Sequence, residues 1–201
     1  MTAPGPALIG LSGAIASGKS AALAALERLG AVTLSTDAVV HQLLDEPATQ
    51  ARLVERWGDA VAPEGRVDRA AVGRIVFSDP AELEWLEGLL HPLVGERVGL
   101  WRAELPPDAE LAVVEVPLLF EAGMEDLFDA TLVVVAGDEL RAERARARGT
   151  TDVDGRAARQ LSEEEKAARA TFVVENKGTL EDLEAALRAL WPRLVAARRA
   201  A

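Results

Sequence analysis

Residues 13–20 constrain the chain more than any other segment. They match the pattern G-x-x-x-x-G-K-[ST] in full, as Gly13, Ala14, Ile15, Ala16, Ser17, Gly18, Lys19 and Ser20. An apolar run at residues 7–11 precedes them, and a stretch rich in alanine and leucine follows at residues 21–29. A strand, a glycine loop and a helix in this order cradle phosphate, because curled N–H groups and a helix N-terminus face the anion. The sequence therefore predicts a nucleoside-triphosphate site.

The alternative to a ligand site is a plain glycine-rich turn between a strand and a helix. The chain has only three lysines (Lys19, Lys166 and Lys177), and one of them occupies the motif position. That placement, together with the strand and helix on either side, favours the phosphate loop. In such a loop we expect Lys19 to reach the β- and γ-phosphates and the Ser20 hydroxyl to ligate Mg²⁺.

Five short apolar runs predict a buried parallel sheet, because their lengths and valine content suit strands covered on both faces. The runs are residues 7–11, 31–34, 111–116, 131–135 and 171–174. Helical patterns alternate with these runs at both ends of the chain, which predicts an α/β fold. Residues 37–105 are almost purely helical in pattern, and we interpret them as an insertion between two strands of one sheet.

Several residues indicate where helices begin and end. Gly30 suits the end of the helix that follows the phosphate loop. Proline in a first turn predicts helix starts at Pro80 and Pro92. Thr179 is placed to cap the last helix, and Pro192 is expected to kink or fray its end. The apolar positions of that helix are spaced three and four apart, at Leu180, Leu183, Leu187, Leu190 and Leu194.

Composition excludes several classes of function. With 33 acidic and 22 basic residues, the net charge of −11 argues against nucleic acid or an anionic membrane as the main partner. The absence of cysteine excludes disulfides, zinc–thiolate and iron–sulfur sites and a thiol nucleophile. Residues 1–18 lack a basic start and are interrupted by glycine and proline, so they predict neither a signal peptide nor a spanning helix. We expect a cytoplasmic protein.

Two further motifs distinguish the classes of phosphate-loop protein. A switch GTPase reads guanine with Asn-Lys-x-Asp, but the segment that starts at Asn176 has Thr179 in place of the aspartate. A motor or transport ATPase usually carries a magnesium-binding aspartate at the end of a strand, whereas the run at residues 111–116 contains Glu115. The short chain and its helical insertion favour a small-molecule kinase, in which the insertion holds the acceptor.

A kinase that acts on an alcohol needs a carboxylate near the acceptor hydroxyl, because a neutral alcohol is a poor nucleophile. Asp37 is the best candidate. It follows the run at residues 31–34, so we expect it at the carboxyl end of a strand, on the same rim as the phosphate loop. The alternative role for Asp37 is a helix cap for residues 38–44.

Cations are also needed to neutralise the transferring phosphoryl group. Arg141, Arg144 and Arg148 are spaced three and four apart, on one face of the helix expected after residues 131–135. An arginine face that leads into the flexible sequence Gly-Thr-Thr is typical of a closing lid. The alternative is a solvated face on which these arginines pair with Glu139 and Glu143.

The motifs along the chain, taken in order, resemble those of the dephospho-coenzyme A kinase family, and the resemblance spans essentially the whole sequence. The residues that carry it are 9–20, 36–38, 67–69, 75–77, His91-Pro92 and 116–121, then Arg156, Gln160, Lys166, Asn176 and Gly178. The resemblance implies ATP-dependent phosphorylation of the ribose 3′-hydroxyl of dephospho-coenzyme A, the last step of coenzyme A biosynthesis. It also implies a five-stranded parallel sheet with helices on both faces, a helical acceptor-binding region and a lid.

The resemblance further implies how one kinase domain is divided and which residues form its site. The core would cover residues 1–36, 106–147 and 171–201, the acceptor-binding insertion residues 37–105, and the lid residues 148–170. ATP and Mg²⁺ are the implied cofactors, with Ser20 on the metal, the loop through Ala21 on the nucleotide and Asn176 near the adenine. Lys19, Arg144 and the general base Asp37 are the implied catalytic residues. The implied acceptor contacts are Asp37, His41, His91, Pro117, Leu118, Glu121 and Arg148.

The chain departs from the usual pattern of that family at four positions. Ser35 takes the place of the first carboxylate in a common Asp-Ala-Asp, which leaves Asp37 alone. His41 replaces a frequent arginine, Arg141 a frequent glutamine and Thr171 a common aspartate.

Two other functions remain open from the residues themselves. One is a phosphate-loop kinase for a different nucleotide or sugar acceptor, and the other is a nucleotide-binding regulatory module without an acceptor. In each case we expect a small-molecule ligand, no nucleic-acid or membrane partner, and a monomer or weak homo-oligomer.

Overall fold

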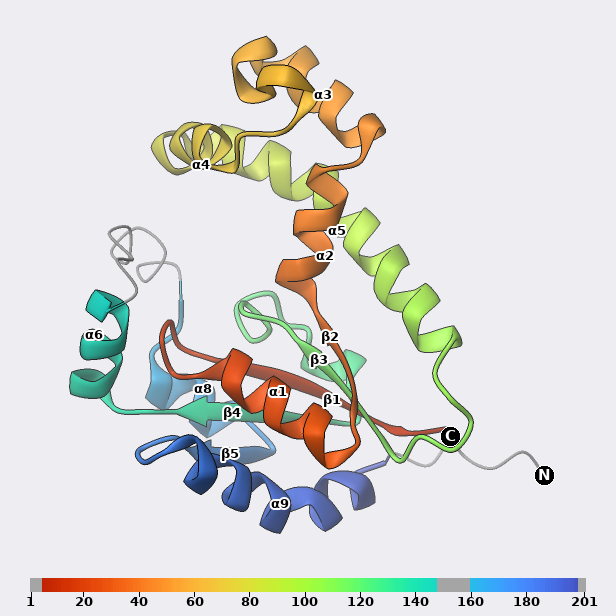
Figure 1. The fold of residues 1–201 in the computed structure, drawn as a ribbon, viewed down its shortest axis with the longest axis vertical. Helices are drawn as coiled ribbons and strands as arrows, with labels where there is room; N and C mark the ends of the chain where they lie inside the picture. The colour runs from red at the N-terminus through yellow and green to blue at the C-terminus, as the bar shows by residue number, and fades with distance from the viewer. Residues whose placement is uncertain (1–4, 148–159, 199–201) are drawn as a thin grey trace. The chain divides into compact units, whose positions relative to one another are not determined.

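The computed structural model describes residues 5–147 and 160–198. The chain forms two compact units, one made of Met1–Ser35 and Leu105–Ala201 and the other of Thr36–Glu104 (Figure 1). None of the described helices is both long and apolar enough to cross a membrane.

The first unit is built on a parallel sheet of five strands in the order β2-β3-β1-β4-β5. The strands are β1 (Ala7–Gly13), β2 (Val32–Ser35), β3 (Leu111–Glu115), β4 (Ala130–Val135) and β5 (Phe172–Glu175). All five expected strands are present, and the predicted α/β fold is confirmed. β1 extends two residues beyond the expected apolar run because its pairing with β4 continues to Gly13, opposite Val134.

The strand order places β1 in the middle of the sheet, between β3 and β4. The chain leaves β1 for the edge strand β2, returns to β3, and then crosses to β4 and β5 on the other side. In open α/β sheets such a reversal opens a crevice at the carboxyl ends of the strands, where ligands bind. The segment after β1 therefore occupies the position that the topology favours for a ligand.

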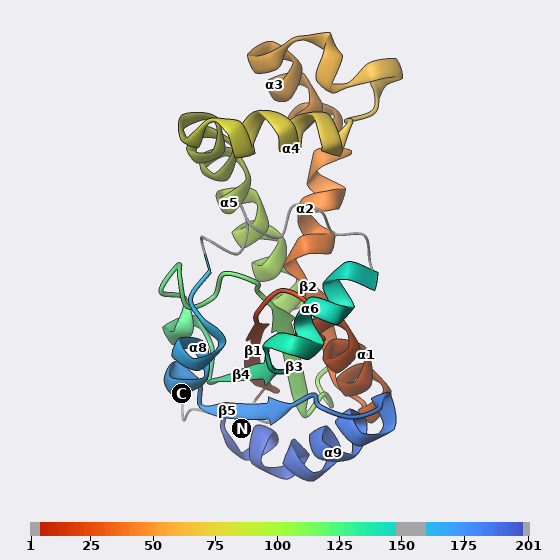
Figure 2. The same ribbon diagram turned by 90° about the vertical axis from the view of Figure 1, so that its left-hand side faces the viewer.

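Helices cover both faces of this sheet. α1 (Lys19–Leu29) and α9 (Leu180–Ala196) pack together on one face, where Leu26 and Leu187 are buried against Ile9 of β1. On the other face, Gly10 leaves room for Leu119 and Phe128, whose side chains lie within 3.0 Å of where a Cβ would stand. Figure 2 shows α8 (Glu163–Arg169) on the opposite side of the sheet from α1.

Local signals set the ends of these helices. Thr179 and Asp182 form a capping box at the start of α9, as expected from the sequence. Gly30, with φ at 111°, ends α1 in a left-handed conformation. α9 continues past Pro192 to Ala196. Leu194, fully buried one turn from the end, secures the last turn by packing.

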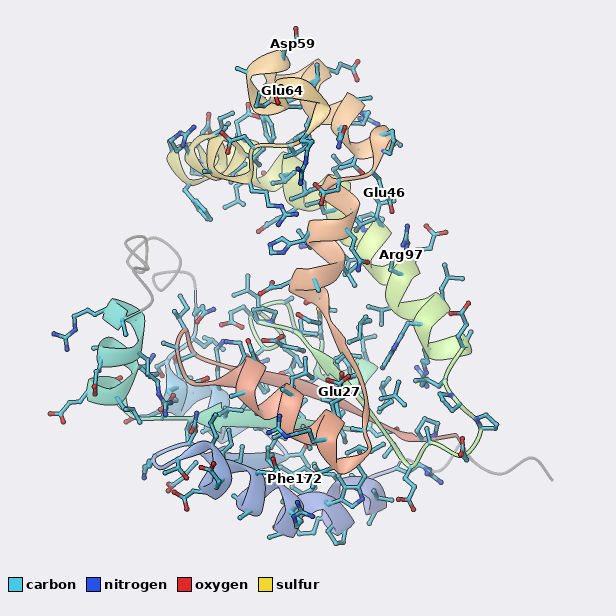
Figure 3. The ribbon with its side chains drawn as sticks, viewed as in Figure 1. Glu27, Glu46, Asp59, Glu64, Arg97 and Phe172 are labelled. Atoms are coloured by element: carbon cyan, nitrogen blue, oxygen red, sulfur yellow. The ribbon has the colours of Figure 1, made fainter. Side chains whose placement is uncertain are left out.

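The second unit is helical throughout, which confirms the expectation for this stretch. Its helices are α2 (Thr36–Leu44), α3 (Pro47–Trp57), α4 (Arg69–Ser78) and α5 (Pro80–Ala103), with short 3-10 turns at Asp59–Val61 and Pro63–Gly65. Asp79 caps α5 and Pro80 occupies its first turn, as predicted. Arg97 of α5 forms an ion pair with Glu46, which precedes α3 (Figure 3).

The expected helix start at Pro92 is wrong, because α5 runs through this proline without interruption. Proline removes one backbone donor and normally breaks or bends a helix. Here α5 contacts both α2 and α4, and Leu86 and Leu90 are buried along it. Tertiary packing on both partners thus outweighs the local preference of the proline for a first turn.

An aromatic cluster joins α3 to α5 in this unit. The rings of Trp57 and Trp85 meet edge to face, with centroids 5.1 Å apart. Glu82 accepts two hydrogen bonds from the Arg56 guanidinium, each at 2.9 Å, and a third from the Trp57 indole at 2.8 Å. These donors lower the pKa of Glu82 below its ordinary value, and the bond from Arg56 is the larger cause.

Candidate active site

The phosphate loop connects the end of β1 to the start of α1, as the sequence predicts. Gly13 can be only glycine, because a Cβ there would lie 2.6 Å from the Val134 oxygen and 2.7 Å from Ser17 Oγ. Gly18, with φ at 100°, stands immediately before α1, and a Cβ there would lie 2.1 Å from Asn176 Nδ2. The two motif glycines therefore allow neighbouring atoms to pack closely against the loop backbone, and they also allow the turn itself.

Lys19 folds back over the loop. Its Nζ lies 2.9 Å from the Gly13 oxygen and 3.1 Å from the Ala14 oxygen, so the ammonium is held at the entrance of the loop. Ser20 and Ala21 follow in the first turn of α1, where unpaired N–H groups give a helix its positive end. A cation, a helix N-terminus and a glycine-rich loop thus lie together at the carboxyl end of β1.

Asn176 supports this loop from the turn between β5 and α9. Its side chain, only 3% exposed, donates from Nδ2 to the Ser17 oxygen over 2.8 Å. Its own N–H donates to the Val135 oxygen at 2.7 Å, which fixes the residue to the end of β4. The resemblance placed Asn176 near the adenine, and the structure places its side-chain amide against the backbone of the phosphate loop.

Arg144 reaches the same point from α6 (Asp138–Ala147). Its Nη2 donates to Asn176 Oδ1 at 3.3 Å, and its Nη1 lies 3.5 Å from the Ser17 oxygen. The structure therefore brings Arg144, Asn176 and the phosphate loop together. Arg148, the next arginine of the expected face, lies outside the described residues.

Arg141 makes different contacts from Arg144. It forms ion pairs with Asp138 and with Glu163, whose Oε1 lies 3.5 Å from Arg141 Nε. These partners differ from Glu139 and Glu143, to which the solvated-face alternative assigned the arginines. Arg141 also lines a pocket of about 630 Å³ beside the tip of the phosphate loop, together with Ala14, Ile15 and residues 160–164.

The segment after β3 lies beside the phosphate loop, because β3 and β1 are neighbours in the sheet. Ser12 Oγ, one residue before Gly13, donates to the Pro117 oxygen at 3.2 Å. Glu121 Oε1 accepts the N–H of Leu161 at 2.8 Å. Leu118 lies between these two attachments. Of the expected acceptor residues, Pro117 is thus bonded to the end of β1, and Glu121 to the residue that precedes Ser162 and α8.

The sequence predicts only that Lys166 is one of the motif residues of the expected lid. In the structure its ammonium is fully buried, 3.1 Å from the Pro117 oxygen and 3.0 Å from Glu121 Oε1. The rarity of lysine in this chain was the one signal that could have drawn attention to it.

Three expected site residues belong to the second unit. Asp37 and His41 lie one turn apart on α2, and both side chains are exposed. α2 begins at Thr36, so Asp37 lies inside the first turn and not in the capping position before residue 38. His91 is an exposed residue of α5.

Comparison with known proteins decides the family. The sequence model of the dephospho-CoA kinase family matches residues 7–182 of this chain. The chain belongs to the dephospho-CoA kinase family. Its relatives include the dephospho-CoA kinase of Deinococcus radiodurans, 43% identical over 92% of this chain and 90% of that protein. The dephospho-CoA kinase of Thermus thermophilus is 41% identical over 94% of this chain and 92% of that protein.

Solved structures share the fold of this chain. The crystal structure of TT1252 from Thermus thermophilus is 39% identical and superposes with a TM-score of 0.79, covering 95% of this chain and 99% of that one. The dephospho-CoA kinase from Campylobacter jejuni, 24% identical with a TM-score of 0.64 over 93% of this chain and 96% of that one, shares the fold.

One departure from the usual dephospho-CoA kinase pattern has a structural account. Thr171, where an aspartate is common, lies opposite Thr131 at the start of β4. The Thr131 N–H donates to Thr171 Oγ1 at 3.2 Å, and the Thr171 N–H donates to Thr131 Oγ1 at 3.0 Å. Each threonine hydroxyl therefore accepts the backbone N–H of the other threonine, and no carboxylate is needed.

Proposed function

We propose that this chain transfers the γ-phosphoryl group of ATP to the ribose 3′-hydroxyl of dephospho-coenzyme A, giving coenzyme A and ADP. Family membership over nearly the whole chain is the observation that carries the proposal. A bond forms between the 3′-oxygen and the γ-phosphorus, the bond from that phosphorus to the bridging oxygen breaks, and the hydroxyl proton leaves. This is the last step of coenzyme A biosynthesis.

On the nucleotide side, we assign the phosphates to the loop of residues 13–21. Support comes from the backbone, which is curled tightly enough that neither Gly13 nor Gly18 has room for a Cβ. Lys19, already held by two loop carbonyls, supplies a positive charge for the β- and γ-phosphates. Arg144 and Asn176 brace the loop at Ser17, and Arg144 adds a second cation for the transferring group.

Mg²⁺ fits the residues that this chain offers. When bound with ATP, the ion would neutralise charge that develops during phosphoryl transfer. Among the described residues, no cluster of three or more acidic or histidine side chains could hold a metal by itself. Mg²⁺ commonly binds through substrate phosphates and water, with few protein ligands. The exposed hydroxyl of Ser20, next to Lys19, is the ligand that we assign.

On the acceptor side, we assign proton removal to Asp37. Asp37 lies in the first turn of α2, two residues after β2 ends, and its carboxylate is exposed, so a ligand can reach it. His41, one turn later, is assigned to acceptor binding with His91, Pro117, Leu118, Glu121 and Arg148.

One assay tests this function against its rivals. ATP consumption is measured with and without dephospho-coenzyme A, and with adenosine, nucleoside monophosphates and shikimate as comparison acceptors. Stimulation by dephospho-coenzyme A alone is the expected result. Stimulation by another acceptor would assign the chain to a different small-molecule kinase activity, and slow hydrolysis that no acceptor changes would indicate a regulatory module.

We further propose that the enzyme works in the cytoplasm as a monomer or weak homo-oligomer, with no nucleic-acid or membrane partner. The net charge of −11 supports the absence of a nucleic-acid or anionic-membrane partner. Light scattering over a range of protein concentrations, combined with cell fractionation, tests both statements. A stable dimer at micromolar concentration or membrane-bound activity would contradict them.

A further inference from the structure

Lys166 carries a charge in a place where charges are costly. Its side chain is fully buried on α8, and burying an ammonium group is unfavourable unless close partners compensate for the lost water. Two partners do so: the backbone oxygen of Pro117 at 3.1 Å and Glu121 Oε1 at 3.0 Å. Both partners belong to the segment that follows β3, at residues 117–121.

These contacts join three parts of the first unit. The Pro117 oxygen accepts from Lys166 and also from Ser12 Oγ, which immediately precedes the phosphate loop. Glu121 Oε1 accepts from Lys166 and also from the N–H of Leu161, just before α8. The segment at residues 117–121 is therefore fixed at one end to β1 and at the other to α8.

A second side chain of α8 strengthens the same attachment. Arg169 lies three residues after Lys166, on the same side of the helix. Its guanidinium stands 5.4 Å above the ring of Phe120 and forms an ion pair with Glu125. α8 thus contacts the segment after β3 through the buried ammonium of Lys166 and the more exposed guanidinium of Arg169.

We propose that Lys166 is a positioning residue for the acceptor side of the reaction. It fixes Pro117 and Glu121 relative to the end of β1, and so relative to the phosphate loop, without contacting substrate itself. Small displacements of a binding group lower the rate of a positioned reaction steeply. The kinetic part of this inference rests on the proposed function, because it takes residues 117–121 as acceptor contacts.

Steady-state kinetics of Lys166→Met test the proposal. Methionine keeps an unbranched apolar stem and removes the charge. We expect the KM for dephospho-coenzyme A to rise about tenfold or more, while the KM for ATP stays within about twofold of wild type. Lys177→Met is the matched control, because Lys177 also lies 3.0 Å from a glutamate oxygen but is 63% exposed. Equal changes in both KM values would overturn the proposal.

A double-mutant cycle tests whether Lys166 acts through Glu121. Glu121→Gln and Lys166→Met are measured separately and together. If the lysine works by holding the glutamate, the acceptor KM of the double variant equals that of the worse single variant. Effects that multiply would show independent roles and overturn the proposal. If Lys166→Met alone does not fold, the double variant, which removes both charges of the pair, is compared with Glu121→Gln, and equal acceptor KM values are again expected.

Hydrogen exchange without any substrate separates this inference from the proposed function. In Lys166→Met we expect faster amide exchange at residues 118–123 and at Leu161, with exchange in α1 and α9 unchanged. A wild-type chain whose ATP consumption does not respond to dephospho-coenzyme A would refute the proposed function yet leave this result intact. Unchanged exchange at residues 118–123 in a folded Lys166→Met protein would overturn the positioning role.

Discussion

The side-chain amide of Asn176 lies 2.8 Å from the backbone oxygen of Ser17, in the middle of the phosphate loop. The two residues stand 159 positions apart in the sequence. The bond is buried, so the loop carbonyl has no water to replace it. The curvature of the loop therefore depends on a residue in the last third of the chain.

Removing this amide should loosen the loop. Among the described residues, the Ser17 oxygen without Asn176 keeps only the long contact of 3.5 Å from Arg144 Nη1. A buried carbonyl that loses its close donor costs about 1–3 kcal/mol, and a deficit of about 1.4 kcal/mol is tenfold in an equilibrium. We expect Asn176→Ala to raise the KM for ATP about tenfold. Gln50→Ala is the matched control, since Gln50 also donates from its side-chain amide to a backbone oxygen, at an exposed site on α3. If Asn176→Ala had the same KM for ATP as Gln50→Ala, the proposed support of the phosphate loop by Asn176 would be refuted.

The two left-handed glycines at the ends of α1 give a second comparison. A Cβ added at Gly18 (φ 100°) would lie 2.1 Å from Asn176 Nδ2, whereas a Cβ added at Gly30 (φ 111°) would meet no atom within 4 Å. A left-handed alanine costs about 1–2 kcal/mol in either place. We expect Gly18→Ala to abolish ATP binding by calorimetry and Gly30→Ala only to lower the melting temperature. Equal ATP binding by the two variants would contradict the close packing at Gly18.

Lys19 can be tested by removing its ammonium. The proposed function requires this charge in both nucleotide binding and phosphoryl transfer, so Lys19→Ala is expected to lose both activities. Fluorescent-nucleotide titration and the ATP consumption assay measure them. The Lys177→Met protein, which loses an exposed ammonium from the same first unit, should keep both. Normal transfer by Lys19→Ala would refute the assignment of the phosphate loop.

Asp37 carries the prediction for catalysis. General-base help is worth about 10²–10⁴-fold, so Asp37→Asn should lose at least about two decades of kcat. Binding of ATP should persist, since the nucleotide is assigned to the first unit. Asp45→Asn serves as the control, because Asp45 is an exposed carboxylate just after the same helix and pairs with Arg69. Near-normal kcat in Asp37→Asn would exclude Asp37 as the base.

Glu82 predicts how the second unit responds to acid. Hydrogen bonds from Arg56, and then from Trp57, hold the pKa of Glu82 below its ordinary value near 4.5. A lowered folded-state pKa gives stability that is present above the unfolded-state value and lost as the pH falls through the folded-state value. The contribution of Glu82 should therefore be complete at pH 7 and disappear below about pH 4.5.

Urea unfolding followed by tryptophan fluorescence measures this contribution. The midpoint of the wild-type protein should exceed that of Glu82→Gln at pH 7, and the difference should shrink steadily at pH values below about 4.5. Comparing the two proteins at each pH cancels the acid response of other carboxylates. A difference that stays constant down to pH 3 would mean that Glu82 does not titrate with folding.

The strands and the phosphate loop could be predicted because their information is local. Runs of apolar residues define β1, β3 and β4, and the motif defines the turn that follows β1. The bond between Asn176 and Ser17 could not be predicted, since nothing near either residue indicates its partner. The burial of Lys166 could not be predicted for the same reason: its partners Pro117 and Glu121 are distant in sequence, and burial of a lysine depends on the packed fold.

Pro92 shows the opposite failure, in which a local rule gave the wrong answer. A proline inside a helix costs about 3 kcal/mol, because it removes a backbone donor and crowds the preceding turn. α5 nevertheless continues through Pro92: the helix contacts α2 and α4, and Arg97, which lies beyond the proline, pairs with Glu46. Local preferences predict an element end only where packing does not continue across it.

The three lysines of this chain have a practical consequence for labelling. Lys19 is bonded to two loop carbonyls and Lys166 is fully buried, so Lys177 is the exposed lysine ammonium. An amine-directed dye would therefore react first, among the lysines, at Lys177. That residue follows Asn176 directly, which places the dye beside the support of the phosphate loop. The chain thus carries a natural attachment point for an optical reporter of nucleotide occupancy.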